Sequence, residues 1–583
     1  MYRCTHCGNL DTTDSEEPFK TCQLADGERC EACQKLSVLD VQISEAKRFL
    51  EDLLYRRREL KSEVNQLHNP IIHRMPLEVV INIFDIYANS WEFAEDSVNH
   101  SPFTLGAVCQ TWRHIVWSTP QLWTSIAMDL SITSSLMRRG VKNNRVQLLS
   151  KYIDLSGNLP LRIALYASDG LKAGFVSPTI KIVNKCSKRW RHLILKLPVL
   201  LLPLFKGHVD EPDVESCRGN AAPVLEKLWI YNTADTFDDE RFSLAGSGNV
   251  PGRKPAPTSV DFWGLSVRSI DVEWNKVTHV TLGDVFMDDV LKLLQCAPEL
   301  IECKISDTCG WEDEIPDVHS ISPLIHPRLQ RLNIDLRGLI FTFLSVVTLP
   351  ALERLKCDFH NYHVSADQFT SFLTRSYSRA SLSTSVSDVN TQLKALWLMG
   401  AGFLEGPSPL IQVCQATPAL VDLRLEEAAS LIRRPTGGSP LLELLQVLSN
   451  ENSVSTAMAT GKQCVDKATE LAANPVPPNR ETPPLLPFLE ILEMTIKFDA
   501  IFPWELIPGI FLPFDASIPS QRRPLNTVDI SCARTSALDQ PPSLLIKPET
   551  VALLCELRKQ GVDLKVHEEW PNESVDLLDK DYS

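Results

Sequence analysis

The stretch PRLQRLNI, residues 327–334, sets the pattern for most of this chain. It returns as PELIECKI from residue 298 and as PALERLKC from residue 350. The last two apolar positions of the unit are two residues apart, so in an extended segment both side chains lie on one face. The leucine three positions earlier fills the bend that leads into this segment. The unit therefore predicts a short strand with one buried face.

The P-x-L-x-x-L-x-L unit is an internal repeat, because it recurs too often for chance. Further copies occupy residues 223–230, 391–398, 418–425 and 487–494, with weaker ones between 266 and 282. Apolar stretches of helical period, such as DDVLKLLQCAP and PLIQVCQATP, precede several copies. The starts at 298, 327 and 350 are 29 and 23 residues apart, close to the spacing of leucine-rich repeats.

Helix, proline turn and strand in repetition predict an irregular leucine-rich-repeat-like α/β solenoid with parallel strands over residues 145–535. An α/β sandwich is the alternative, and it would need βαβ units without the repeated leucine spacing. Loop insertions are expected at residues 241–259, 378–388 and 449–484, which are rich in glycine, proline or serine or are polar.

The solenoid suggests a surface for a client protein. In each unit the residue between the last two apolar positions points away from the core, and exposed Trp and Arg are the residue types that dominate binding hot spots. The client-binding candidates are Trp229, Lys304, Asn333, Lys356, Trp397, Arg424 and Glu493. The alternative is that both tryptophans pack against loops.

A second organising stretch precedes the repeats. Residues 69–91 read NPIIHRMPLEVVINIFDIYANSW and residues 101–126 read SPFTLGAVCQTWRHIVWSTPQLWTSI. Large apolar residues recur at helical spacing, one stripe in each part, and Pro120 begins a third short helix. The sequence predicts a three-helix segment with a long insert from Asn89 to Thr104. Fewer than about sixty residues cannot bury so much apolar surface, which indicates a docking face.

This segment resembles the F-box, whose pattern is roughly L-P-x-E-I-L-x-x-I-F, then V-C-x-x-W-x-x-I and L-W. Met75 stands where leucine is usual, and the insert is longer than usual. The resemblance implies an F-box over residues 70–130 that binds the Skp-type adaptor of a cullin–RING ubiquitin ligase. The adaptor-binding residues it implies are Met75, Pro76, Leu77, Glu78, Val80, Ile83, Phe84, Leu105, Val108, Cys109, Trp112, Ile115, Leu122 and Trp123. The alternative is an ordinary helical core.

The chain as a whole resembles the large F-box protein family of mushroom-forming fungi. Beyond the F-box the resemblance rests on a preceding heptad helix, on GNLPLRIAL and RWRHLILKLP, on WNKVTHVTL at 274–282, and on units such as CAPEL from residue 296. It implies a substrate receptor of an SCF-type ubiquitin ligase, joined through the adaptor to cullin and RING subunits and holding an unidentified client. A non-ligase scaffold that assembles partners is the alternative.

Residues 36–69 predict a coiled-coil helix. With Leu36 as position a, the a and d positions through residue 67 are apolar except Arg57, and Asn69-Pro70 ends the helix. These a and d positions form an apolar seam along the helix. The seam predicts either a homodimer through residues 36–67 or packing on the helices that follow in the same chain.

The leader, residues 1–35, contains Cys4-x-x-Cys7 and Cys30-x-x-Cys33. Two such pairs can give four thiolates to a structural zinc, with His6 or Cys22 as substitutes for one ligand. The alternatives are a disordered leader with incidental cysteines and a redox motif, the latter without its flanking strand and helix. Zinc is the single cofactor that the sequence suggests.

Composition and motif content argue against several classes of function. The formal net charge is −15 and there is no long basic run, so nucleic-acid binding is not expected. No apolar run approaches the roughly 20 residues that span a bilayer, and the N-terminus does not read as a secretory signal, so the expected location is cytoplasmic or nuclear. No nucleotide, zinc-protease or hydrolase motif is present, which favours a non-catalytic receptor. Residues 565–583 read as an acidic tail. The expected class is a multidomain α+β protein.

Overall fold

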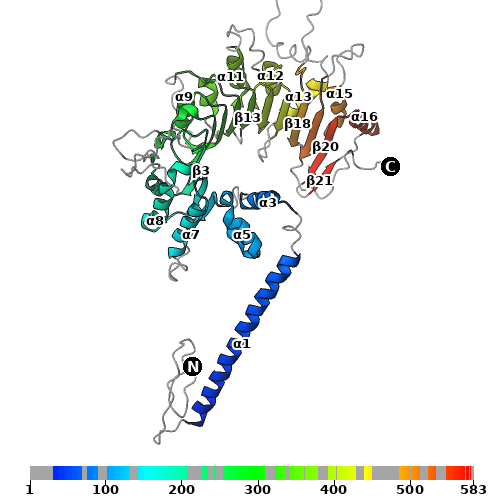
Figure 1. The fold of residues 1–583 in the computed structure, drawn as a ribbon. Helices are drawn as coiled ribbons and strands as arrows, with labels where there is room; N and C mark the ends of the chain where they lie inside the picture. The colour runs from blue at the N-terminus through cyan, green and yellow to red at the C-terminus, as the bar shows by residue number, and fades with distance from the viewer. Residues whose placement is uncertain are drawn as a thin grey trace, which may run out of the picture. The chain divides into compact units, whose positions relative to one another are not determined.

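The computed structural model describes the residues 30–68, 75–89, 101–131, 142–206, 225–233, 242–243, 254–308, 322–335, 340–359, 362–378, 392–401, 404–427, 439–449, 485–497, 502–511, 523–533, 547–570, 573–576 and 578. They form two compact units, divided near Ser125. The first is helical. The second combines one large, mostly parallel sheet with many helices (Figure 1), so the expected mixed α and β class is confirmed.

Helix α1 spans Glu31–His68, 38 residues, and includes the whole predicted heptad segment. It begins five residues earlier than the heptad pattern indicates, because Glu31 and the residues after it continue the helix across the second cysteine pair. The side chains of its a and d positions are largely exposed.

The segment predicted as three helices contains four helical pieces. Their bounds are α3 Leu77–Asn89, α4 Pro102–Val108, α5 Gln110–Ser118 and the 3-10 helix η2 Pro120–Trp123. The expectation of a single second helix was wrong, because Cys109 is extended (φ −154°, ψ 172°) and separates α4 from α5. Its Sγ accepts a hydrogen bond from the backbone N–H of Trp112, and the side chain of Ser101 caps α4 in the same way. The predicted insert also ends earlier than Thr104, because α4 begins at Pro102.

Aromatic side chains form the core of this helical segment. The rings of Phe84 and Trp112 lie 4.7 Å apart, which joins α3 to α5. Phe103, Trp117 and Trp123 form a second cluster with ring separations of 4.9 to 5.5 Å. The indole N–H of Trp123 donates to the carbonyl of Val116 at 2.8 Å, so the buried indole is also hydrogen-bonded.

The second unit is built on a 15-stranded sheet in which spatial order follows chain order. From β2 to β20 neighbouring strands pair in parallel, and β21 closes the edge antiparallel to β20. The strands are β1 Ser125–Asp129, β2 Leu161–Tyr166, β3 Trp190–Leu197, β4 Lys227–Asn232, β6 Ser259–Trp263, β8 His279–Val285, β9 Glu302–Thr308, β11 Arg331–Asp335, β13 Arg354–Asp358, β15 Ala395–Met399, β17 Asp422–Glu426, β18 Ile491–Lys497, β19 Thr527–Ala533, β20 Asp563–Trp570 and β21 Glu573–Asp576.

The repeated leucines explain these strands. In β11 the side chains of Leu332 and Ile334 are buried, and so is Leu329 in the bend before the strand. Backbone hydrogen bonds also join each strand to the preceding one at the residues just before the strand begins. The N–H groups of Gln330 and Arg331 both donate to the carbonyl of Ile301, and equivalent pairs recur from β6 to β19. Each unit therefore contributes one bend and one buried strand, and successive units extend the sheet in one direction.

The helices of the second unit lie along one side of its sheet (Figure 1). They are α7 Lys142–Leu155, α8 Ala173–Lys185, α9 Met287–Cys296, α10 Ile340–Val346, α11 Ala366–Ser378, α12 Pro409–Ala416, α13 Pro440–Ser449, α15 Ile507–Phe511 and α16 Pro548–Lys559, with 3-10 helices η3 Ser187–Arg189, η4 Val199–Leu204, η5 Val267–Ser269, η6 Trp274–Lys276 and η12 Trp504–Leu506. Three two-stranded parallel ladders accompany them. These pair β5 Phe242–Ser243 with β7 Ile270–Asp271, β10 Leu324–Ile325 with β12 Val347–Thr348, and β14 Val364–Ser365 with β16 Leu404–Glu405.

The ends of the sheet correct the predicted boundaries. The expected acidic tail from residue 565 contains most of β20 and all of β21, because Leu564 and Val566 bury their side chains as the other strands do. The sheet also begins at β1, before residue 145, and continues past residue 535. Most of the three predicted loop insertions lies outside the described residues, although Ser259 already belongs to β6 and Ser378 to α11.

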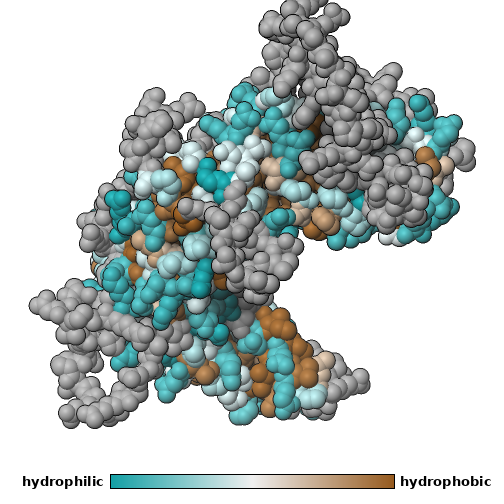
Figure 2. All heavy atoms as spheres, turned by 90° about the horizontal axis from the view of Figure 1, so that it is seen from above, coloured by the Kyte–Doolittle hydropathy of each residue, from teal (hydrophilic) through white to brown (hydrophobic). Residues whose placement is uncertain are grey.

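Exposed large apolar side chains are concentrated in the first unit, mainly on α1 and α3. On the face shown in Figure 2, hydrophobic residues gather in patches among hydrophilic ones. Among the described residues no helix is both long and apolar enough to cross a membrane. Contiguous exposed apolar surface commonly marks a place where a partner binds.

Candidate protein-interaction surfaces

Helix α3 has two apolar faces. Val80, Phe84 and Ala88 are buried, and Phe84 is only 1% exposed. Ile83 and Ile86 are exposed, the latter at 69%. The inner face packs in the core of the segment. The outer face is an apolar stripe that this core does not cover.

The predicted adaptor-binding residues therefore separate into two groups. The exposed ones, which a partner can touch, are Met75, Pro76, Leu77, Glu78, Ile83 and Val108. The buried or half-buried ones, which hold the segment together, are Val80, Phe84, Leu105, Cys109, Trp112, Ile115, Leu122 and Trp123. The prediction did not include three exposed apolar residues, Val79, Ile86 and Trp117. Helical spacing could have found Val79 and Ile86, because both share a face with Ile83.

The predicted client-binding residues share one lateral row of the sheet. Lys304, Asn333 and Lys356 are register partners on β9, β11 and β13. The row continues through Trp397 and Arg424 to later strands. Its full course from β4 is Trp229, Asp261, Thr281, Lys304, Asn333, Lys356, Trp397, Arg424, Glu493, Asp529 and Lys565. Because strand side chains alternate, this row points away from the buried leucines.

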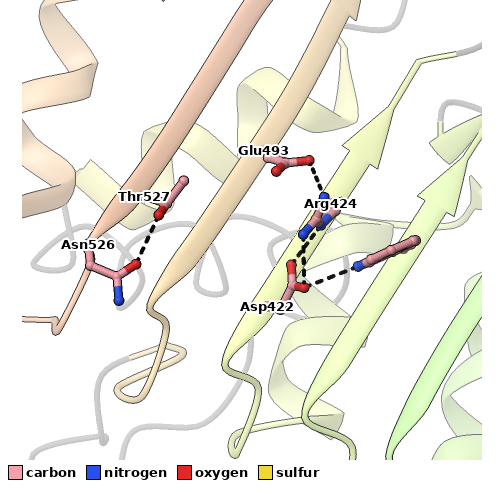
Figure 3. A network of polar contacts seen from close by, with 6 residues as sticks. Asp422, Arg424, Glu493, Asn526 and Thr527 are labelled. Carbon is pink, nitrogen blue, oxygen red and sulfur yellow. Dashed lines mark hydrogen bonds and ion pairs between the residues drawn. The ribbon is translucent and has the colours of Figure 1, made fainter. Parts of the chain in front are cut away.

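A polar network fixes the C-terminal part of this row (Figure 3). Arg424 donates to Asp422 on its own strand at 3.0 Å and to Glu493 on β18 at 2.8 Å. Its guanidinium lies 4.4 Å from the ring centre of Trp397, and the indole N–H of Trp397 donates to Asp422 at 3.3 Å. Lys356 lies on the same ring at 5.7 Å. Trp397 is thus held by the side chains of its own row.

A second feature is an aromatic platform that the sequence analysis did not identify. We use this name for Tyr231 and Trp263, whose rings are stacked with centres 5.6 Å apart. Lys196, Tyr231, Trp263 and Gly283 are successive register partners on β3, β4, β6 and β8, and Lys196 lies 5.5 Å from the Tyr231 ring. Trp263 covers Gly283, where a Cβ atom would come within 2.1 Å of the indole. A glycine inside a strand was the signal that could have found this site.

Gly283→Ala is expected to displace the Trp263 indole and break its stacking on Tyr231, because the added methyl would occupy the place of the ring. The near-ultraviolet circular dichroism of the aromatic rings should change. The free energy of unfolding should fall by only about 1 to 3 kcal/mol, as for other overpacked sites. Gly174→Ala is the matched control, because no atom lies within 4 Å of its added Cβ. An unaltered aromatic spectrum in Gly283→Ala would show that the indole does not lie on Gly283.

The N-terminal part of the same face is basic around His192. The Nε of Arg162 donates to the His192 Nδ1 at 3.0 Å, which requires an unprotonated Nδ1. Burial, with the charges of Arg162, Lys227 and Arg191, lowers the pKa of His192 to about 4. Glu226 lies 3.7 Å from the Nε2 and opposes this shift without overcoming it. His192 is therefore neutral at physiological pH.

His192 should make the second unit less stable in mild acid. Its pKa is lower in the folded chain than in the unfolded chain, so the unfolded state binds the extra proton and stability falls as pH drops from about 6.5 to 4. Chemical unfolding at several pH values should show that the free energy of unfolding falls by on the order of 2 kcal/mol over this pH range. The variant His192→Gln should lack this component of the loss, and identical pH profiles for the two proteins would contradict the assignment.

The cysteines separate into different roles. Cys30 and Cys33 are buried at the start of α1, and the backbone N–H of Cys33 donates to the Sγ of Cys30 at 3.4 Å. Cys4, Cys7, His6 and Cys22 lie outside the described residues, so the zinc site stays a prediction. Within the described part of the chain no group of His, Cys, Asp or Glu could hold a metal. Burial raises the pKa of Cys303 and of Cys414 to about 12, as expected for inert core thiols.

One shallow surface hollow of about 410 Å³ lies against α11. Its lining residues, which include Asp367, Thr370 and Arg375, all come from this helix. Within the described parts of the chain no residue of a second element lines it, so these residues do not offer the convergent groups of an enclosed binding site.

Comparison with known proteins adds no family to these observations. No protein-family model matches the chain, and no curated protein matches it either. The outer apolar stripe of α3 and the polar face of the sheet are therefore the two candidate interaction surfaces.

Proposed function

We propose that this chain is the substrate receptor of an SCF-type ubiquitin ligase. In this proposal residues 70–130 are an F-box, the outer stripe of α3 binds a Skp-type adaptor, and the second unit is a leucine-rich-repeat-like solenoid that binds a client protein. The chain itself catalyses no reaction. It acts by raising the effective concentration of the client near a ubiquitin-loaded enzyme that the cullin and RING subunits bring.

The observation that carries the proposal is the outer stripe of α3. Val79, Ile83 and Ile86 are exposed on a helix whose other face is already buried, so the segment does not need them for its own core. An apolar stripe at helical spacing fits a partner that supplies a matching apolar groove or helix. The resemblance of residues 75–123 to the F-box pattern supports the adaptor as this partner.

The client surface is supported by its residue types. Aromatic and arginine side chains, the commonest hot-spot residues, lie in adjacent rows on the polar face of the sheet. Trp397 and Arg424 are fixed by their neighbours, which lowers the entropy lost on binding. A client with both apolar and charged groups fits this face.

Binding to a purified Skp-type adaptor tests the proposal. We expect the full chain and the adaptor to bind with submicromolar affinity and to elute together from a sizing column. The complex should contain one adaptor molecule for each copy of the chain. Failure of the folded chain to bind the adaptor would favour the second candidate, a scaffold without ligase function. That candidate draws on the exposed seam of α1, which can assemble protein partners without an adaptor.

A further inference from the structure

Among the described residues, no element covers the central part of the heptad seam of α1. Leu53 and Leu60, two of its d positions, are 44% and 61% exposed, and Ile43 and Leu50 at a positions are also exposed. Helices with such a seam are stable in water mainly when the apolar stripe is packed against a partner. The described residues leave this stripe open to solvent, and its pattern indicates which partner fits.

The apolar pattern is symmetric about the midpoint between Glu51 and Asp52. Leu50 and Leu53 lie at equal distances on either side of this point, and so do Phe49 and Leu54, which widen the seam at its centre. Ile43 and Leu60 form the next symmetric pair. A segment whose pattern is the same from both ends can pair with a reversed copy of itself, because every a position then meets a d position of the partner.

Arg57, the one charged residue in the seam, decides between the two orientations. In a parallel, in-register pair the two Arg57 side chains would share one layer, and the two Ala46 side chains would leave another layer underfilled. In addition, Arg56 at a g position would face Lys61 at the following e position, which places like charges together. All three effects oppose the parallel dimer.

The reversed arrangement removes these conflicts. Arg57 then lies opposite Ala46 of the other chain, so the largest seam residue meets the smallest one, and its guanidinium can extend past the methyl group to water. This complementary layer occurs twice in the dimer, once on each side of the symmetry axis.

We propose that α1 forms an antiparallel two-fold coiled coil with a second copy of this chain, centred between Glu51 and Asp52. The helices overlap over roughly 45 Å, from the rise of about 1.5 Å per residue. The two copies of residues 75–123 follow the C-terminal ends of α1 and therefore start from opposite ends of the coiled coil. The dimer is a bivalent receptor with separated modules, and this inference does not depend on the identity of their partner.

Sedimentation equilibrium of the full chain tests the association. At micromolar concentration we expect a species of twice the 65.4 kDa chain mass. Leu53→Asp should weaken the dimer at least about 100-fold, because the charge is buried twice at the centre of the seam. Val41→Asp is the matched control, since it also replaces an exposed apolar residue of α1 by aspartate, but outside the seam, and should leave the mass doubled. A monomeric native chain, or equal dimerisation of both variants, would overturn the proposal.

Orientation is tested separately. Ala46→Glu should preserve or tighten the dimer, since the new carboxylate meets Arg57 of the other chain, whereas in a parallel dimer it would meet its own copy and weaken association. A photoreactive phenylalanine analogue at position 43 should cross-link to the peptide that contains Leu60. Within one helix these positions are roughly 25 Å apart, too far for an intrachain product. Cross-linking of position 43 to its own copy would establish the parallel dimer and overturn the proposal.

Discussion

Replacing Ile83 and Ile86 of α3 by aspartate is expected to abolish adaptor binding while the chain stays folded. Both side chains are exposed, with Ile86 at 69%, so neither contributes much to the core of residues 75–123. Each would bury a full apolar side chain against the adaptor, worth about 1.5 to 3 kcal/mol, and each aspartate would also bury a charge. The affinity of the double variant should therefore fall by a factor of about 1,000 or more.

The choice of positions matters for this experiment. Trp112 resembles an F-box signature residue, but its ring lies 4.7 Å from Phe84, so Trp112→Ala would loosen the segment as well as alter binding. Leu200→Asp is the matched control, because Leu200 is also exposed and apolar but belongs to the second unit. Undiminished adaptor binding by Ile83→Asp/Ile86→Asp would remove the outer stripe of α3 from the interface.

Arg523→Met is expected to destabilise the C-terminal part of the sheet by about 3 kcal/mol or more. Arg523 is 3% exposed and donates to the backbone carbonyls of Leu448, Leu485 and Ile510 at 3.0 to 3.2 Å. These carbonyls belong to α13 and the bend before β18, which lie in the connection from β17 to β18, and to α15 in the connection from β18 to β19, so one guanidinium joins two consecutive connections. Methionine fills a similar volume but leaves the carbonyls without this donor.

Hydrogen exchange locates this loss. Because each unit of the sheet contacts mainly its neighbours, protection should fall from β17 to β20 and remain in β2 to β6. Arg268→Met, at an exposed arginine within η5, should change stability by less than about 0.5 kcal/mol. A uniform loss of protection over the sheet, or none, would contradict the role assigned to Arg523.

The strands with the proline–leucine unit were predictable because each of its three apolar positions has one structural task. Leu329 fills the bend of β11, and Leu332 and Ile334 fill the core, so the sequence spacing directly reflects the strand. The strands β19 and β20 were missed. Val528 and Ile530 of β19 replace the leucines, and β20 has no proline before it, although both strands bury the same positions as the others.

The candidate surfaces were predictable to different degrees. The alternation of strand side chains was sufficient to place Lys356, Trp397 and Arg424 in one row, because strand register depends on a period of two. A family pattern cannot separate buried from exposed positions, so Phe84 and Ile83 were assigned the same role. The break at Cys109 was also missed, because a stripe of helical spacing does not reveal one extended residue within it.

The central claim is that this chain connects a client to a ubiquitin ligase, and affinity purification of the full chain from cells under proteasome inhibition tests it most directly. Mass spectrometry of the eluate should recover a Skp-type adaptor in near-stoichiometric amount, together with cullin and RING subunits. The same purification with Ile83→Asp/Ile86→Asp should lose all three while retaining the client. Recovery of the folded native chain without any Skp-type adaptor would contradict the account.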